Sequence, residues 1–269
     1  MVEWLRQLYI TDPTFYLDEA QHRFQQHFSK DISKSSICRV LQKKGFSRKV
    51  LVKRAIQIKN AKIEFYCSEL QSLKWDTFNI VFLDEVSFDN RDISRSMGYG
   101  PVGKIILERG NHVRQTRISL LCFMGVGGLL EAFSTDGTFS RNIFFEACRN
   151  ITLSGQVNQY PGKNSIWILD GARIHIDPNM VRYFRSLGII FVFLPGYCPH
   201  MNPIEIFIGL IKQIFKRFYD NMDHNSLKVF VLQILMKFTS FDAIKLFKKC
   251  GYYPGDGLKP SLKQANKHE

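Results

Sequence analysis

The sequence lacks paired cysteines, long apolar runs and any linker of distinct composition. Its six cysteines stand far apart, without a C-x-x-C pair or regularly spaced partner histidines, which argues against a zinc site or a disulfide framework. No run reaches the roughly 18 apolar residues of a membrane span, and no signal-peptide pattern follows Met1. We therefore expect a soluble, intracellular protein that is neither secreted nor inserted in a membrane.

Acidic residues are also scarce, because the 269 residues include 24 Asp and Glu against 37 Lys and Arg, a formal net charge of +13. The excess is concentrated between Phe28 and Phe65, where eleven Lys and Arg against two acidic residues contribute +9. A basic block of this kind predicts a polyanionic partner, above all nucleic acid. The alternative is a solvated helix face.

The first 54 residues contain patterns for three short helices, about 2–10, 16–28 and 34–44, the last of them capped by Ser33. Three helices with a basic third one fit a helix-turn-helix, although many units that do not bind DNA share this pattern. The third helix would enter a major groove by its N-terminus. The predicted DNA-contacting residues are Lys34, Ser35, Ser36, Arg39, Lys43 and Lys44, followed in a basic tail by Arg48, Lys49, Lys53 and Arg54.

Two apolar runs are each followed directly by an aspartate. Residues 78–83 lead to Asp84, and a second run leads to Asp170. A helix-like segment and a strand-like run, about 189–194, then precede Glu205 at the mouth of another helix. Right-handed crossovers bring the carboxyl ends of parallel strands to one edge of a sheet, where open α/β sheets place their chemistry. The three acids are therefore expected to meet, although 34 residues lie between the second and the third.

Three carboxylates a few ångströms apart cannot all stay ionised without compensation, since like charges raise one another's pKa. Divalent cations provide it, and oxygen-only ligands favour Mg²⁺ or Mn²⁺. A pair of such ions about 3.5–4 Å apart is the arrangement that serves phosphodiester chemistry. Asp84, Asp170 and Glu205 are thus the predicted catalytic residues and metal ligands. Glu85 competes with Asp84, but adjacent strand residues point to opposite faces, so only one of them can join the cluster.

Two further polar residues lie close to these acids in the sequence and are predicted to support them. His175 follows Asp170 by five positions. The sequence leaves three roles open for His175. It either supports a metal ligand from behind, contacts a phosphate, or is a plain surface histidine. Asn202 precedes Pro203, a residue that suits the first turn of a helix. It is the cap of that helix or only a turn residue.

The strings FLDE, ILDGARIH and LPGYCPHMNPIE carry the three acids, and in this order and spacing they resemble the signatures of DDE transposases of the mariner superfamily. YLDEAQHRF, SSICRVLQKKGFSRK, GYGPVGK and FKKCGY extend the resemblance over nearly the whole chain. It implies a ribonuclease-H-like α/β fold, in which helices flank a mixed sheet. It also implies metal-dependent DNA cleavage and strand transfer at element ends.

The same resemblance implies a homodimer acting on double-stranded DNA, both terminal inverted repeats and target sites, in the nucleus of a eukaryote or otherwise in the cytoplasm. Relatives commonly carry two helix-turn-helix units, and only the second has a counterpart in this sequence. The expected parts are a helix-turn-helix unit with basic tail (1–54), a linking helix (55–75), the catalytic domain (76–221) and a C-terminal helical extension (222–269). Two alternatives stay open, a non-catalytic DNA-binding protein derived from a transposase and a structure-selective ribonuclease-H-like nuclease.

Overall fold

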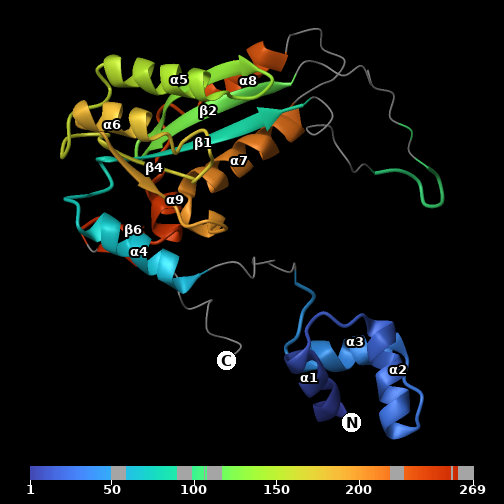
Figure 1. Ribbon diagram of the computed structural model, residues 1–269. Helices are drawn as coiled ribbons and strands as arrows, with labels where there is room; N and C mark the ends of the chain where they lie inside the picture. Colours follow the sequence, from blue (N-terminus) through green and yellow to red (C-terminus); the bar gives the residue numbers. More distant parts are fainter. Residues whose placement is uncertain are drawn as a thin grey trace. The chain divides into compact units, whose positions relative to one another are not determined.

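The chain folds into two compact units, residues 1–54 and 55–269, in a computed structural model. The structure describes residues 1–49, 59–89, 99–105, 107, 117–218, 227–255 and 257–259. Within these residues, no helix combines the length and the apolar character needed to cross a bilayer. The two units are described separately (Figure 1).

The first unit is a bundle of three helices, as the sequence predicts. These are α1 (Val2–Thr11), α2 (Leu17–Phe28) and α3 (Lys34–Lys43). Their apolar stripes meet in a small core that includes Leu5, Phe24 and Ile37. Ser33 caps α3 as expected, because its hydroxyl accepts a hydrogen bond of 3.1 Å from the backbone N–H of Ser36.

The second unit is built on a five-stranded mixed sheet with the order β3-β2-β1-β4-β5. β1 pairs antiparallel with β2 and parallel with β4, and β4 pairs parallel with β5. β2 and β3 form a hairpin that closes between Gly125 and Gly128. The strands are β1 (Ile80–Phe88), β2 (Ile118–Gly125), β3 (Gly128–Asp136), β4 (Ile166–Leu169) and β5 (Ile190–Phe193).

The first strand differs from its prediction. The sequence places the end of the strand at residue 83, whereas β1 continues through Asp84 and Glu85 to Phe88. The parallel ladder with β4 reaches the Phe82–Ile168 pair, while the antiparallel ladder with β2 continues to Phe88. Asp84 therefore lies within a strand, but at the position where its parallel neighbour stops.

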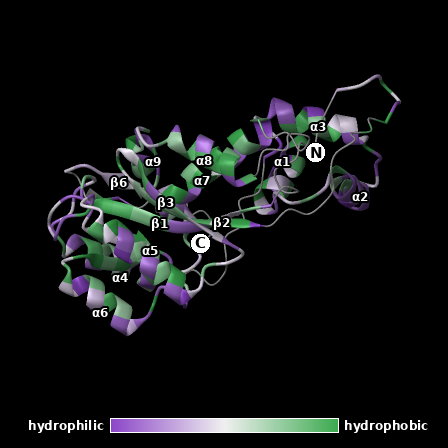
Figure 2. Cartoon of the chain, turned by 90° about the horizontal axis from the view of Figure 1, so that it is seen from above, coloured by the Kyte–Doolittle hydropathy of each residue, from purple (hydrophilic) through white to green (hydrophobic). Residues whose placement is uncertain are grey.

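One face of the sheet is covered by α5 (Arg141–Leu153) and α6 (Pro178–Ser186), which lie together on one side in Figure 1. Alternate strand residues such as Val81 and Leu83 pack against their apolar stripes. Trp167 is fully buried at the centre of this layer, with ring centroids 5.4 Å from both Phe123 and Phe191. Figure 2 shows β1 and β2 as mostly hydrophobic and α5 and α6 with both characters, as expected for helices with one face in a core.

The opposite face carries the other alternate residues, including Ile80 and Phe82, and the remaining elements of the second unit. The helices that supply this core are α4 (Asn60–Gln71), α7 (Pro203–Phe218), α8 (Leu227–Met236) and α9 (Ile244–Lys249), with the short strands β6 (Tyr252–Tyr253) and β7 (Gly257–Leu258) nearby. The segments expected as a linking helix and a C-terminal extension thus share the core of the sheet. The division into four functional parts stays a prediction.

Two buried tyrosines on this face of the sheet, from distant parts of the chain, contact each other through their hydroxyl groups. The hydroxyl groups of Tyr66 in α4 and Tyr252 in β6 lie 2.6 Å apart, and the Tyr252 hydroxyl donates to the carbonyl oxygen of Met201 at 2.9 Å. Met201 ends the short 3-10 helix η1 (Pro199–Met201), directly before the corner that leads into α7. The C-terminal part of the chain therefore supports the backbone immediately upstream of Glu205.

Candidate active site

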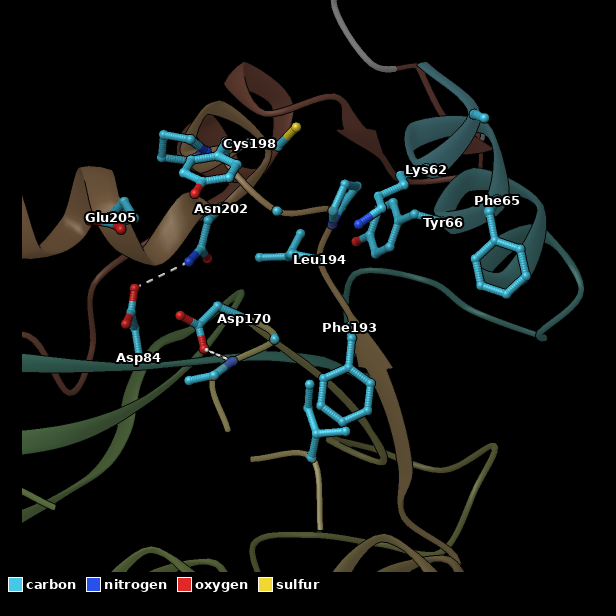
Figure 3. Close-up of a pocket in the computed structure, with 18 residues that line it drawn as sticks. Lys62, Phe65, Tyr66, Asp84, Asp170, Phe193, Leu194, Cys198, Asn202 and Glu205 are labelled. Carbon is cyan, nitrogen blue, oxygen red and sulfur yellow. Dashed lines mark hydrogen bonds between the residues drawn. The ribbon is translucent and has the colours of Figure 1, made fainter. Parts of the chain in front are cut away.

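The three predicted acids line one cavity of about 800 Å³ at the edge of the sheet. Asp84 reaches it from β1, Asp170 directly follows β4, and Glu205 lies in the first turn of α7. Figure 3 shows their carboxylates gathered at one end of this cavity. The sequence prediction that Asp84, Asp170 and Glu205 lie near one another in the fold agrees with this arrangement.

Asp84 is the least exposed of the three acids. Burial, the charges of Glu205 and Asp170 and then that of Glu85 raise its pKa to about 8, and the backbone N–H of Glu85 offsets part of this effect. The Asn202 side chain donates from Nδ2 to Oδ2 of Asp84 at 3.2 Å. At neutral pH, in the absence of a cation, this carboxyl group is therefore largely protonated.

The Asp170 carboxylate contacts the side chain of His175, a residue only 1% exposed. The Nδ1 atom of His175 lies 2.7 Å from Oδ1 of Asp170, and its Nε2 atom lies 2.8 Å from Oε1 of Glu85. Burial alone would lower the pKa of His175, but the hydrogen bonds to Asp170 and Glu85 raise it to about 10. The same contact with His175 lowers the pKa of Asp170. The imidazolium thus bridges two carboxylates, and the interpretation of His175 as a surface histidine is wrong.

The alternation of side chains along β1 determines which residues Glu85 contacts. Asp84 and Glu85 point to opposite faces of β1, so Asp84 meets Asn202 while Glu85 meets His175, whose ring packs 4.4 Å from that of Phe144 in α5. Glu85 therefore lies on the other face of β1 from Asp84. It contacts the far side of the histidine that holds Asp170.

Asn202 is the polar side chain between the first and third acids. It is 3% exposed, and its side chain binds Asp84, while its carbonyl oxygen accepts a hydrogen bond of 3.2 Å from the backbone N–H of Glu205. Its Oδ1 atom is buried without a hydrogen-bond partner among the described residues. A buried oxygen of this kind is costly unless a donor or a cation satisfies it.

The oxygen atoms at this end of the cavity are suited by their chemistry to bind a hard divalent cation. The ligand atoms available at this end of the cavity are carboxylate oxygens and the free amide oxygen of Asn202, which suit Mg²⁺ or Mn²⁺. Burial raises the pKa of Asp84 most, and the charges of Glu205, Asp170 and Glu85, which a cation would offset, raise it further. No three His, Cys, Asp or Glu side chains within the described ranges are grouped tightly enough to hold one ion. Asp84 and Asp170 are instead engaged by Asn202 and His175, respectively.

The predicted DNA-contacting residues lie in the first unit. Lys34, Ser35 and Arg39 are exposed on α3, whereas Ser36 is half-buried and its hydroxyl lies 2.8 Å from that of Ser33 in the cap. Lys43, Lys44, Arg48 and Lys49 are also exposed. Lys53 and Arg54 lie outside the described residues.

Part of the cavity wall has no counterpart in the sequence prediction. Lys62 and Phe65 of α4 and Tyr197 of the loop after β5 line it together with the three acids. α4 was expected only as a linking helix. Helical periodicity identifies its buried stripe of Ile63, Tyr66 and Leu70, and the isolated Phe65 on the exposed face is the one local signal of a second role.

Comparison with known proteins gives a family and a fold. The family described as DDE superfamily endonuclease matches residues 79–228. Among solved structures, the Mos1 transposase paired-end complex with left transposon end has 14% sequence identity to this chain and a TM-score of 0.67. The match covers 93% of this chain and 74% of the Mos1 chain. The pre-cleavage Mos1 transpososome has 13% identity, a TM-score of 0.66 and the same coverage. No curated protein matches.

The comparisons confirm the fold class expected from the sequence. The second unit is a ribonuclease-H-like mixed sheet flanked by helices, and helices precede it in the chain. The resemblance to DDE enzymes drawn from the strings around the three acids is also confirmed, with the fold of mariner transposases.

Proposed function

Because this chain belongs to the DDE superfamily endonuclease family, we propose that it is a metal-dependent DNA transposase that cuts phosphodiester bonds at element ends and joins the freed strands to target DNA. The observation that carries this proposal is the convergence of Asp84, Asp170 and Glu205 in one cavity. Solved structures of similar fold are complexes of Mos1 transposase with transposon ends, one of them a strand transfer complex. That similarity supports DNA as the substrate.

The proposed ligands are the three carboxylates, with Mg²⁺ or Mn²⁺ as the cofactor and two ions in the working site. When bound, such a pair activates a water or a 3′-hydroxyl for attack on phosphorus and stabilises the leaving oxygen. Asn202 orients Asp84 through its amide nitrogen. Glu205 enters the site from the first turn of α7, which Pro203 opens. Water attack gives cleavage and 3′-hydroxyl attack gives strand transfer, so one site serves both reactions.

His175 acts in this proposal as a positioning residue, since it touches Asp170 and not the substrate. Replacing it with Ala is expected to lower the nicking rate by about 10- to 100-fold, the usual cost of losing a side chain that orients a metal ligand. The loss should be larger at limiting Mn²⁺ than at saturating Mn²⁺, because Asp170 is no longer held in place. Nicking rates measured across a Mn²⁺ titration test this.

The control for that experiment is His22→Ala, which changes an exposed histidine of the first unit. It should leave the Mn²⁺ dependence unchanged. If His175→Ala lowers the rate by the same factor at every Mn²⁺ concentration, or not at all, the role assigned to the bridge between Glu85 and Asp170 is incorrect.

The first unit is proposed to bind double-stranded DNA as a helix-turn-helix, with the N-terminus of α3 in a major groove. In this proposal Ser35 and Arg39, whose side chains are exposed, contact base edges, and the exposed lysines that follow contact phosphates. Paired-end cleavage requires two copies of the site, so the proposed assembly is a homodimer, acting in the nucleus or, in a cell without one, in the cytoplasm.

The basic test of the function is nicking of supercoiled plasmid DNA by the purified chain. We expect conversion to the open circular form with Mg²⁺ or Mn²⁺ and none when the ions are chelated. Joining of a precleaved 3′ end to the plasmid would establish strand transfer. Binding without any cutting in Mn²⁺ would leave only a DNA-binding protein derived from a transposase.

A further inference from the structure

The active-site cavity carries two exposed aromatic side chains that the catalytic proposal does not use. Figure 3 shows the acids at one end and Lys62 and Phe65 of α4 at the other, with Leu194 between them. Tyr197 also lines the cavity. Phe65 is 68% exposed and Tyr197 is 66% exposed. Two large aromatic side chains thus lie largely open to solvent in the same cavity as the catalytic carboxylates.

Neither ring belongs to the hydrophobic core. Phe65 lies on the side of α4 opposite Ile63, Tyr66 and Leu70, which make that helix's contribution to the core. Tyr197 has a φ of 63°, a left-handed conformation that is unfavourable for a bulky side chain. A turn alone would be served better by Gly or Asn at this position. A large exposed ring held in an unfavourable backbone conformation indicates a ligand for that ring.

The size and charge of the cavity limit that ligand. A volume of about 800 Å³ is in the range of small-molecule sites, about 300–1,000 Å³, and is too small for a duplex. Exposed aromatic rings stack on bases that are not paired, and an exposed ammonium such as that of Lys62 suits the adjoining phosphates. The acids at the other end fix where the reacting phosphate lies.

Resting on the proposed nuclease function, we propose that Phe65 and Tyr197 each stack on unpaired nucleotides of the strand that leads to the scissile phosphate, with Lys62 on its backbone. The substrate of the cavity is then a DNA end whose last bases have left the duplex. Every base has a π-face, so the site accepts any sequence.

The test uses the full chain, with divalent ions chelated, and two DNA probes. One is a duplex with a 3′ tail of unpaired thymidines that carries 5-iododeoxyuridine, and the other is the same strand annealed to a longer complement that also pairs with the tail, which gives a blunt duplex. We expect the tailed duplex to bind about tenfold more tightly, within the range of one base stacked on an aromatic ring. Irradiation should cross-link the tail to the peptides that contain Phe65 or Tyr197.

Variants separate stacking from a role in folding. Phe65→Ala and Tyr197→Ala should each remove the preference for the tail and the cross-link at the changed position, whereas Phe65→Tyr and Tyr197→Phe should keep both. Phe78→Ala is the matched control, because Phe78 is 49% exposed but lines a different hollow at the other end of β1. It should behave as the wild type.

The inference is overturned if the wild type binds tailed and blunt duplexes equally, or cross-links elsewhere. It is also overturned if the conservative variants lose as much as the alanine variants, or if Phe78→Ala loses the same. Failure of the nuclease proposal looks different. If the wild type prefers the tail but never nicks DNA, the stacking proposal stands and the nuclease proposal fails. If the wild type nicks DNA without preferring the tail, the nuclease proposal stands and the stacking proposal fails.

Discussion

Replacing Asp84 or Asp170 with Asn, or Glu205 with Gln, is expected to abolish metal-dependent DNA nicking. Each change removes one negative oxygen from the proposed metal site while keeping the shape of the side chain. A bound metal contributes several kcal/mol of transition-state stabilisation, so the expected loss is on the order of a thousandfold or more. The measurement is the initial rate of plasmid nicking in Mg²⁺ and in Mn²⁺.

Binding to a DNA duplex, measured in parallel, should change little in these variants, because the proposed duplex-binding surface lies in the first unit. Glu146→Gln is the matched control, since Glu146 is an exposed carboxylate on α5 that does not line the cavity. It should nick at the wild-type rate. Nicking that persists in all three site variants would mean that the chemistry occurs elsewhere.

The Asp84→Asn variant is also expected to be more stable than the wild type at alkaline pH when no divalent ion is present. Burial and the neighbouring acids raise the pKa of Asp84 to about 8, against about 3.9 in an unfolded chain. The folded state therefore holds this proton more tightly, and ionisation destabilises it progressively as pH rises from about 4 to about 8. Each unit of pKa difference corresponds to about 1.4 kcal/mol, so the gap above pH 8 should reach a few kcal/mol.

Thermal unfolding of both proteins at pH 5 and pH 8.5 tests this, since the other titrating groups are common to the pair. The stability gap should widen with pH. Adding Mn²⁺ at pH 8.5 should stabilise the wild type more than Asp84→Asn, because a ligand that binds only the folded state shifts unfolding by mass action. A gap that is the same at both pH values would show that the Asp84 carboxyl group is not ionising in a buried, negatively charged place.

Most elements of this fold can be predicted from local patterns. β4 is a short apolar run that ends at Asp170, and α6 begins where Asp177 can cap it and Pro178 suits its first turn. Asp177 does accept from the backbone N–H groups of Asn179 and Met180. The three acids follow from the same patterns, because the rule that places the ends of parallel strands at one edge needs no knowledge of distant contacts.

What the sequence hides depends on contacts between distant residues. The extension of β1 beyond Asp84 comes from pairing with β2, whose partner residues lie thirty or more positions further along the chain. The contact between Glu85 and His175 spans 90 positions, and no local pattern reveals that His175 is buried. Strand alternation excludes Glu85 as a ligand but does not say what it binds. The role of α4 in the cavity wall is hidden for the same reason.

The hydroxyl group of Tyr252 has a consequence for where the catalytic fragment ends. The family match stops at residue 228, yet the carbonyl of Met201 depends on a tyrosine 51 positions further along. A fragment trimmed at the family boundary would lose the hydroxyl that pairs with this carbonyl and with Tyr66, together with core residues such as Phe247 that pack on the same face of the sheet. A fragment that keeps these contacts has to include Tyr252 and its strand partner Leu258, a segment that looks dispensable when only the acidic signatures are aligned.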